Sequence, residues 1–262
     1  MNFSLKGKNA LVCGGSQGIG NAIAVQFAEM GANVTIVSRN EASLKLALTR
    51  LNKEYGQNHT YFSIDFSNPD VVFKAINDFI SSGTTINILV NNTGGPALGR
   101  IIDATCENLM LAFKQHVLAS QILTRAVVPG MHKSGFGRIL NVISVGARQP
   151  IENLGISNTI RGAMMSWSKT LSRELAPNGI TVNNLLPGYT STNRLKELFE
   201  QRGKISGKTV EQMTQDIIKD IPFNRLASPG EIGFAAGFLA SEEAAYITGV
   251  SLPIDGGFLK CI

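Results

Sequence analysis

The chain of 262 residues has few cysteines and no long apolar segment, and each shortage excludes a class of protein. Its three scattered cysteines, Cys13, Cys106 and Cys261, cannot form a disulfide framework, and no Cys-x-x-Cys pair predicts a metal site. No segment reaches the roughly 18–20 uninterrupted apolar residues of a membrane span, and the N-terminus lacks the apolar core of a signal peptide. We therefore expect a cytoplasmic protein with no metal and no membrane contact.

Charge is also sparse. Charged residues form 16% of the chain, and the basic residues behind its net charge of +5 are spread along it instead of forming a run or stripe. We expect no nucleic-acid partner, since an anionic cofactor accounts for the sign of the charge. Hydrophobic residues, at 44%, and 27 glycines are abundant, which is typical of a compact globular protein with many tight turns.

Short apolar runs alternate with longer helical stretches along most of the chain. The predicted strands are residues 10–13, 34–37, 61–64, 86–90, 138–143 and 180–186. The predicted helices are residues 18–30, 41–55, 69–81, 105–131 and 155–176. Continuous apolar strands that alternate with helices indicate parallel strands buried on both faces. We expect one doubly wound (Rossmann) α/β domain over residues 1–262, with a parallel sheet of about seven strands and helices on both faces.

Residues 193–220 depart from this alternation, because they are charged and contain no strand. Leu195, Leu198, Phe199, Met213, Ile217 and Ile218 recur at helical spacing. We interpret this segment as a helical flap over a largely hydrophobic pocket for a small-molecule substrate. Thr209 with Gln212, and Ser228 with Glu231, fit capping boxes at the start of two helices.

A glycine-rich turn follows the first strand, with the sequence Gly14-Gly15-Ser16-Gln17-Gly18-Ile19-Gly20. Glycines permit a tight turn and let the backbone approach a pyrophosphate at a helix N-terminus. With a strand before it and a helix after it, the turn predicts a dinucleotide site that includes Gly14, Ser16, Gln17, Gly18, Ile19 and Gly20.

The end of the second predicted strand indicates which dinucleotide is bound. An acidic residue there would bind a ribose 2′-hydroxyl, but the chain has Ser38 and Arg39. A guanidinium pairs with phosphate in bidentate fashion, so these residues favour NADP(H) over NAD(H).

Further motifs identify a family resemblance. Asn91-Asn92-Thr93-Gly94, Pro187-Gly188 with Thr192, and Ile254-Asp255-Gly256-Gly257 follow the glycine turn in order. Together they resemble the motifs of the short-chain dehydrogenases/reductases over nearly the whole chain. The resemblance implies that Asp65 lies beside the adenine, with Phe66 also at the cofactor.

The resemblance also implies that Asn91 and Gly94 form part of the cofactor wall, and that Pro187, Gly188 and Thr192 adjoin the nicotinamide. It further implies a homotetramer or homodimer, associated through the helices near residues 105–131 and 155–176.

The family's reaction uses a serine, a tyrosine and a lysine, the last two lying four residues apart on one helix face. Ser144, at the carboxyl end of a predicted strand, corresponds to the serine. Counting onward by the family spacing places Ser157 at the tyrosine position and Arg161 at the lysine position. His116 stands where the family usually has a proton-relay asparagine.

This pair cannot simply repeat the family's proton transfer. A phenol with a pKa near 10 can be tuned toward neutrality, whereas a serine hydroxyl titrates far higher and arginine stays protonated. Tyr189, after the Pro-Gly turn, is either a cofactor-lining aromatic or a substitute phenol.

Three functions remain open. The first is an NADP(H)-dependent oxidoreductase, similar to 3-oxoacyl reductases, in which Ser144 and Ser157 bind a carbonyl oxygen, Arg161 binds the nicotinamide ribose and His116 passes protons. The second is a non-redox enzyme that resembles the halohydrin dehalogenases, with Arg161 binding an anion. The third is a cofactor-binding but catalytically degenerate subunit or sensor.

Overall fold

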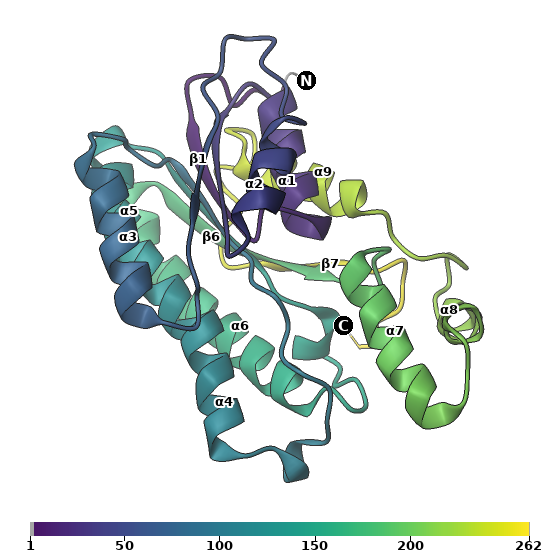
Figure 1. The fold of residues 1–262 in the computed structure, drawn as a ribbon. Coiled ribbons are helices and arrows are strands. Elements are labelled where there is room, and N and C mark those ends of the chain that lie inside the picture. The colour runs from purple at the N-terminus through teal and green to yellow at the C-terminus, as the bar shows by residue number, and fades with distance from the viewer. Residues whose placement is uncertain (1–2, 262) are drawn as a thin grey trace.

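Seven parallel strands form the centre of the computed structural model, which describes residues 3–261 (Figure 1). They are β1 (Asn9–Cys13), β2 (Asn33–Ser38), β3 (Thr60–Ser63), β4 (Ile88–Asn91), β5 (Gly137–Val142), β6 (Ile180–Pro187) and β7 (Ser251–Ile254). Their order across the sheet is β3-β2-β1-β4-β5-β6-β7, so the order reverses between β1 and β4. This arrangement confirms the predicted doubly wound fold.

Helices cover both faces of the sheet (Figure 1). They are α1 (Gly18–Glu29), α2 (Glu41–Leu48), α3 (Pro69–Ser81), α4 (Cys106–Phe113), α5 (Ala119–Ser134), α6 (Gly155–Leu175), α7 (Asn193–Ser206), α8 (Val210–Lys219) and α9 (Pro229–Ala240). Helices α1, α2 and α9 pack on one face, and α3, α5 and α6 pack on the other. None of the described helices has the length and apolarity needed to cross a bilayer.

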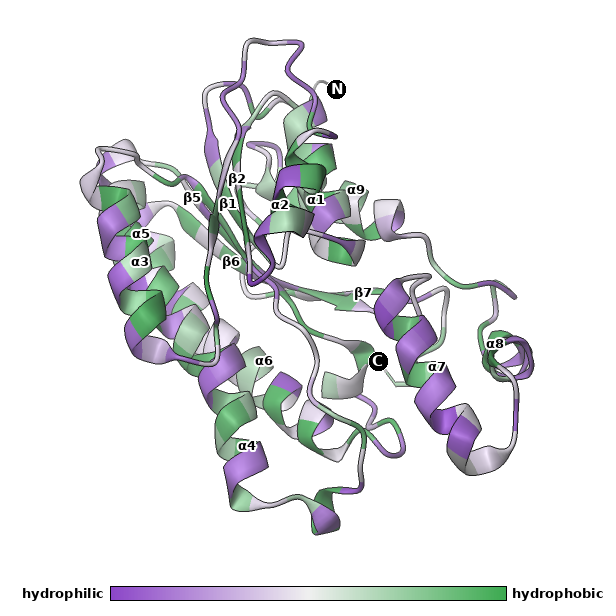
Figure 2. Cartoon of the chain, in the orientation of Figure 1, coloured by the Kyte–Doolittle hydropathy of each residue, from purple (hydrophilic) through white to green (hydrophobic). Residues whose placement is uncertain are grey.

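The central strands are apolar because both of their faces are covered. In β1, Ala10 and Val12 pack in the core under α1 and α9, whereas Leu11 and Cys13 pack under α3 and α5. Successive side chains of a strand point to opposite faces, and burial of each large aliphatic side chain contributes roughly 1.5–3 kcal/mol. Figure 2 shows the resulting concentration of hydrophobic residues on the strands and the mixed polarity of the helices.

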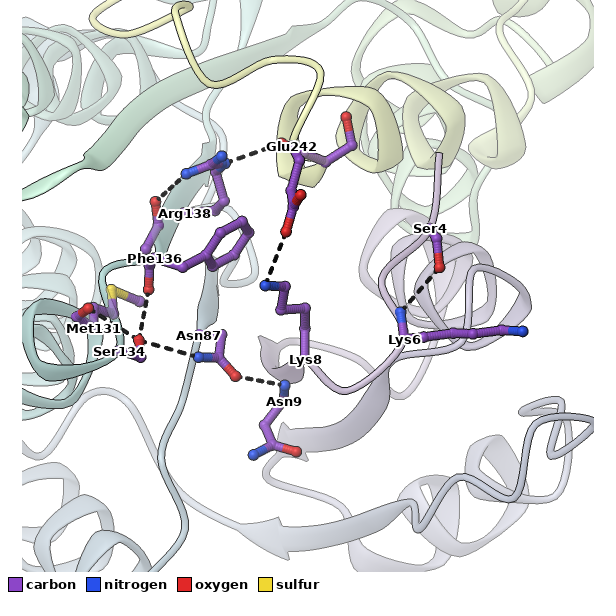
Figure 3. A network of polar contacts seen from close by, with 12 residues as sticks. Ser4, Lys6, Lys8, Asn9, Asn87, Met131, Ser134, Phe136, Arg138 and Glu242 are labelled. Carbon is purple, nitrogen blue, oxygen red and sulfur yellow. Dashed lines mark hydrogen bonds and ion pairs between the residues drawn. The ribbon is translucent and has the colours of Figure 1, made fainter. Parts of the chain in front are cut away.

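The amino edge of the sheet is joined by polar side chains (Figure 3). The backbone N–H of Asn9 donates to Oδ1 of Asn87, next to β4, at 2.9 Å. Lys8 forms an ion pair of 3.1 Å with Glu242, and the buried Arg138 of β5 donates to a carbonyl of the same segment after α9. These contacts tie β1, β4, β5 and α9 together at the edge opposite the carboxyl ends of the strands.

The prediction of a helix over residues 41–55 is wrong in its second half, because α2 ends at Leu48. The following segment is held by side chains that bond to the backbone of the core. Gln57 donates to a carbonyl of α1 at 2.7 Å, and Nδ1 of His59 accepts the N–H of Val34 in β2 at 3.1 Å. These long-range contacts outweigh the local helical periodicity.

The predicted helix over residues 105–131 contains an interruption. Thr105 caps α4, and the five residues Lys114–Leu118 form a π-helical turn (η2) before α5 continues to Ser134. The hydroxyl of Ser120, in the first turn of α5, donates to the carbonyl of His116 at 2.7 Å. Periodicity cannot reveal a single wide turn.

Two strands also differ from the prediction. The strand predicted over residues 86–90 lies at Ile88–Asn91, and β7 was not among the predicted strands.

The segment 193–220 forms helices α7 and α8, as predicted. Thr192 caps α7, and Thr209 and Gln212 form both halves of the predicted capping box before α8. At the start of α9, Glu231 accepts the N–H of Ser228 at 2.8 Å, also as predicted. Figure 1 shows α7 and α8 next to each other at one end of the molecule. Their role as a substrate flap stays a prediction.

Candidate active site

A cleft of about 560 Å³ lies at the carboxyl edge of the sheet. Its walls come from the segments that follow the first six strands, from the start of α6, and from the first turns of α7. This is the edge at which doubly wound folds bind ligands, around the point where the strand order reverses. The cleft brings together most of the residues predicted from the sequence, and it also excludes three of them.

The glycine-rich turn forms one wall, and Gly14, Ser16, Gln17, Gly18, Ile19 and Gly20 all line the cleft. Gly14 and Gly18 have φ angles of 60° and 57°, which other residues rarely adopt. A Cβ atom at Gly20 would collide with the carbonyl oxygen of Gly14. The N-cap of α1, Gln17, makes no side-chain capping bond, so the first N–H groups of the helix remain available to a pyrophosphate.

Ser38 and Arg39 line the cleft at the end of β2, as predicted. The Oγ atom of Ser38 is buried and has no hydrogen-bond partner among the described residues, and the Arg39 side chain makes no ion pair with them. Asn40 and Ser43, which the sequence analysis did not name, also line this end. An orphaned hydroxyl beside an exposed guanidinium fits the 2′-phosphate of NADP(H).

Phe66 lines the cleft, but Asp65 does not. The carboxylate of Asp65 instead accepts the N–H of Ser67 at 3.0 Å and its hydroxyl at 2.8 Å. These hydrogen bonds hold the pKa of Asp65 below its usual range. Its position beside an adenine stays a prediction.

Asn92, not Asn91, reaches the cleft after β4. Asn91 is buried in the sheet, where its Nδ2 atom donates to Oδ1 of Asn141 at 2.8 Å, and Asn141 donates in turn to Asn184 at 3.1 Å. Asn92 donates to the carbonyl of Cys13 at 3.2 Å and so joins the glycine turn to β4. The motif was located correctly, but its residues divide between the sheet and the cleft. Gly94 lines the cleft, as predicted.

Ser144, Ser157 and Arg161 meet at the other end of the cleft. Ser144 lies two residues after the buried strand β5, and its Oγ accepts the N–H of Gly146 at 3.0 Å. Ser157 and Arg161 lie four residues apart on α6, on one face of the helix. Asn158, between them, forms two hydrogen bonds with the backbone of Ile151 and fixes the loop that precedes α6.

Arg161 is a buried cation. Its side chain donates from Nη1 to the carbonyl of Val142 at 3.0 Å, and the residue is only 8% exposed. Burial, with a smaller contribution from the charge of Arg194, lowers the pKa of Arg161 to about 10. The guanidinium therefore stays charged at neutral pH.

His116 lies behind the cleft wall instead of lining it. Its Nδ1 atom is 2.5 Å from Oγ1 of Thr93, which does line the cleft, and the donor of this hydrogen bond depends on the histidine tautomer. Burial and the charge of Arg161 lower the pKa of His116 to about 2, so the imidazole is neutral. Thr93 thus links the imidazole of His116 to the cleft, a role that its place in the Asn91–Gly94 motif did not indicate.

Pro187 at the end of β6, and Gly188 and Thr192 after it, line the cleft, and their place beside a nicotinamide stays a prediction. Arg194 also lines it, and donates to the carbonyls of Gly95 at 3.3 Å and Pro96 at 2.7 Å. These bonds join α7 to the segment after β4, on the opposite wall of the cleft. The flap sequence gave no signal for this role.

Tyr189 lines the cleft but is packed in an aromatic cluster. Its ring lies edge-on to Phe258, with centroids 5.3 Å apart, and 6.3 Å from the ring of Phe199. This packing agrees with the interpretation of Tyr189 as a lining aromatic.

Two other expectations concern metals and assembly. No group of three or more histidine, cysteine, aspartate or glutamate side chains among residues 3–261 is arranged to hold a metal ion. The predicted self-association through the helices near 105–131 and 155–176 stays a prediction.

Comparison with known proteins identifies the family of the chain. Residues 14–259 match the family model described as enoyl-(acyl carrier protein) reductase. The 3-oxoacyl-[acyl-carrier-protein] reductase FabG of Vibrio cholerae is 35% identical, over 97% of this chain and 98% of its own. The NADPH-dependent reductase BacG of Bacillus subtilis is 30% identical, over 97% of this chain and 99% of its own.

Solved structures show the same fold. The L-sorbose reductase of Gluconobacter frateurii, in complex with NADPH and L-sorbose, superposes with a TM-score of 0.93 at 33% identity, covering 100% of both chains. The NADPH-dependent reductase YwfH, of bacilysin biosynthesis, has a TM-score of 0.91 at 30% identity, covering 97% of this chain and 99% of its own. These NADPH-dependent relatives support the predicted NADP(H) cofactor. The chain belongs to the short-chain dehydrogenase/reductase family of oxidoreductases.

Proposed function

We propose that this protein is an NADP(H)-dependent oxidoreductase that transfers a hydride between the nicotinamide and the carbon of a keto or hydroxy substrate, as 3-oxoacyl reductases do. One observation carries the proposal. A single cleft runs from the glycine turn and Arg39 to the hydroxyls of Ser144, Ser157 and Thr93. A phosphate-binding end and a hydroxyl-lined end in one cleft suit a dinucleotide and a carbonyl compound lying end to end.

The proposed cofactor residues divide by position. Arg39 and Ser38 hold the 2′-phosphate, the backbone of the glycine turn holds the pyrophosphate, and Pro187, Gly188 and Thr192 lie near the nicotinamide. Bound NADP(H) supplies or accepts the hydride. Arg161 binds the nicotinamide ribose, since it has donors beyond the one that Val142 accepts.

Ser144 and Ser157 donate hydrogen bonds to the substrate oxygen. In the reducing direction, a hydride reaches the carbonyl carbon and a proton, ultimately from solvent, reaches the oxygen. Hydroxyls aimed at this oxygen stabilise the charge that develops on it, and the nearby charge of Arg161 adds to this effect.

Proton movement is assigned to Thr93 with His116. The neutral imidazole contacts the hydroxyl of Thr93, and its Nε2 atom has no hydrogen-bond partner among the described residues. His116 therefore serves the proton relay by orienting the Thr93 hydroxyl, and a proton that this hydroxyl gives to the substrate oxygen is replaced from solvent in the cleft.

The test is NADPH oxidation by the purified protein with a panel of ketones and oxo acids, with NADPH binding measured by fluorescence on the same samples. We expect turnover that needs NADPH. Tight NADPH binding with no turnover, and activity only after a related chain is added, would instead identify a degenerate subunit. Product formation without nicotinamide would identify a non-redox enzyme.

A further inference from the structure

Among residues 3–261, no carboxylate forms an ion pair with Arg161. Its one hydrogen bond among the described residues goes to the carbonyl of Val142, although a guanidinium carries five N–H donors. Its other nitrogen atoms are not among the buried polar atoms without a partner, and the residue lines the cleft. These donors therefore open toward whatever occupies the catalytic half of the cleft.

A second guanidinium reinforces this charge. Arg194 lines the same cleft, and its charge contributes to the lowered pKa of Arg161. Its nearest carboxylate, Oε2 of Glu197, is 3.8 Å from Nη1, is exposed, and lies outside the cleft lining. Among the described residues that line the cleft there is no aspartate or glutamate, and His116 behind the wall is neutral.

A buried charge is costly unless a partner of opposite sign compensates it. Helix α6 carries no tyrosine whose ionisation Arg161 might assist. The nicotinamide ribose offers hydroxyls, which accept hydrogen bonds but bring no negative charge. An anionic group on the other ligand in the cleft, the substrate, would place a negative charge directly at Arg161.

We infer that the substrate is an oxo acid or hydroxy acid whose anionic group binds Arg161 and Arg194. The inference rests on the proposed function, and it adds the class of substrate. Ser157 and Arg161 are separated by one helical turn, about 5–6 Å between Cβ atoms. Both residues line the same cleft, so one small ligand can place its carbonyl oxygen at Ser157 and its charged group at Arg161, as in a 2-oxo or 3-oxo acid. Ile151, Leu154 and Leu198 line the cleft for an apolar remainder.

The test measures binding to the enzyme–NADP⁺ complex, in which an oxo compound cannot be reduced. Calorimetry compares 2-oxo-4-phenylbutanoate with its methyl ester, which has the same skeleton and no charge. We expect the acid to bind at least tenfold more tightly. The measured quantity is the ratio of the affinity for the acid to the affinity for the ester. Arg161→Met should bring this affinity ratio close to one, and Arg194→Gln should lower it. Arg161→Lys should keep most of the preference for the acid.

Arg202→Gln is the matched control. Arg202 lies on α7 like Arg194 and also donates to a backbone carbonyl, that of Glu152 at 2.9 Å, but it does not line the cleft. This variant should keep the wild-type ratio. Equal binding of acid and ester by the wild type would overturn the inference. So would an acid preference that survives both Arg161→Met and Arg194→Gln, or an Arg194→Gln that weakens only NADP⁺ binding.

Turnover is measured separately with NADPH. An acid that binds selectively but is never reduced would leave this inference standing and remove the proposed function. Equal reduction of acid and ester would keep the proposed function and remove the inference. If Arg161→Met fails to fold, the affinity ratio of acid to ester in Arg194→Gln still tests the inference, because an unchanged ratio in that variant would overturn it.

Discussion

The nucleotide half of the cleft is built mainly from backbone, whereas the catalytic half is built from side chains of several elements. In the nucleotide half, glycines set the shape of one turn between β1 and α1. In the catalytic half, Ser144 comes from the segment after β5, Arg161 from α6 and Thr93 from the segment after β4. The first half depends on consecutive residues and a fixed turn geometry, and the second on packing between elements that are distant in the chain. The two halves should therefore respond differently to substitution.

The nucleotide half should fail most completely when its backbone is blocked. Gly20→Ala places a Cβ against the carbonyl of Gly14, so we expect NADPH binding to weaken by at least about 100-fold, with overpacking that costs roughly 1–3 kcal/mol of stability. Fluorescence titration and thermal unfolding measure both effects. Gly162→Ala on α6, where a Cβ would meet nothing within 4 Å, is the control. NADPH affinity within threefold of the wild type in Gly20→Ala would contradict the account of the turn.

The catalytic half should lose rate while it keeps the cofactor. Ser144→Ala and Ser157→Ala each remove a donor to the substrate oxygen, and we expect kcat to fall by about 10²–10³-fold. The NADPH dissociation constant should change less than threefold. Ser166→Ala, an exposed serine on the same helix α6, should leave both quantities unchanged. Comparable losses of rate in this control would show that the effect comes from the helix.

Cofactor choice should depend on one side chain of the nucleotide half. Arg39→Ala removes the proposed phosphate partner, so the preference for NADPH over NADH should fall by about 10–100-fold, the value of a charge-assisted hydrogen bond. The ratio of the two dissociation constants measures this directly. Arg50→Ala, an exposed arginine just beyond α2, should preserve the ratio. A preference that persists without Arg39 would place phosphate recognition elsewhere.

The buried imidazole of the catalytic half should make the fold sensitive to acid. The pKa of His116 is about 2 in the folded protein and its ordinary value is 6.5, so below pH 6.5 the unfolded chain binds a proton that the folded protein does not. The free energy of unfolding should therefore fall as pH drops below 6.5, by up to about 1.4 kcal/mol per unit from this residue. His59, whose pKa burial also lowers, acts in the same direction.

Urea unfolding between pH 7.5 and 4.5 measures this slope. His116→Asn should make it shallower, whereas His132→Asn, on the exposed end of α5, should not change it. A slope that is the same in all three proteins would contradict the burial of a neutral imidazole at this position.

The same contrast explains what the sequence could predict. The glycine turn, Ser38, Arg39 and the parallel sheet follow from local patterns, because consecutive residues determine both the turn and the burial of the strands. Ser144, Ser157 and Arg161 were located through the family resemblance, by counting along its motif spacing from the end of a predicted strand. Asn91 was predicted to line the cleft, but Asn92 lines it instead. The error arose because the exact end of β4 determines which side chain faces the sheet and which faces the ligand.

The roles of Thr93 and Arg194 depend on contacts that local patterns do not encode. Thr93 acquires a role because a π turn brings His116 against it, and Arg194 because α7 packs across the segment after β4. The end of α2 at Leu48 was missed for a related reason, since Gln57 and His59 bond to distant backbone groups.

The most direct test of the central claim follows the hydride itself. NADPH carrying deuterium on the transferred face of C4 is incubated with the protein and an oxo acid, and the product is examined by mass spectrometry and NMR. Our account predicts one deuterium on the new carbinol carbon, with the label lost from the cofactor in equal amount. Product without deuterium from either face of C4, or tight NADPH binding with no product for any carbonyl compound, would contradict it.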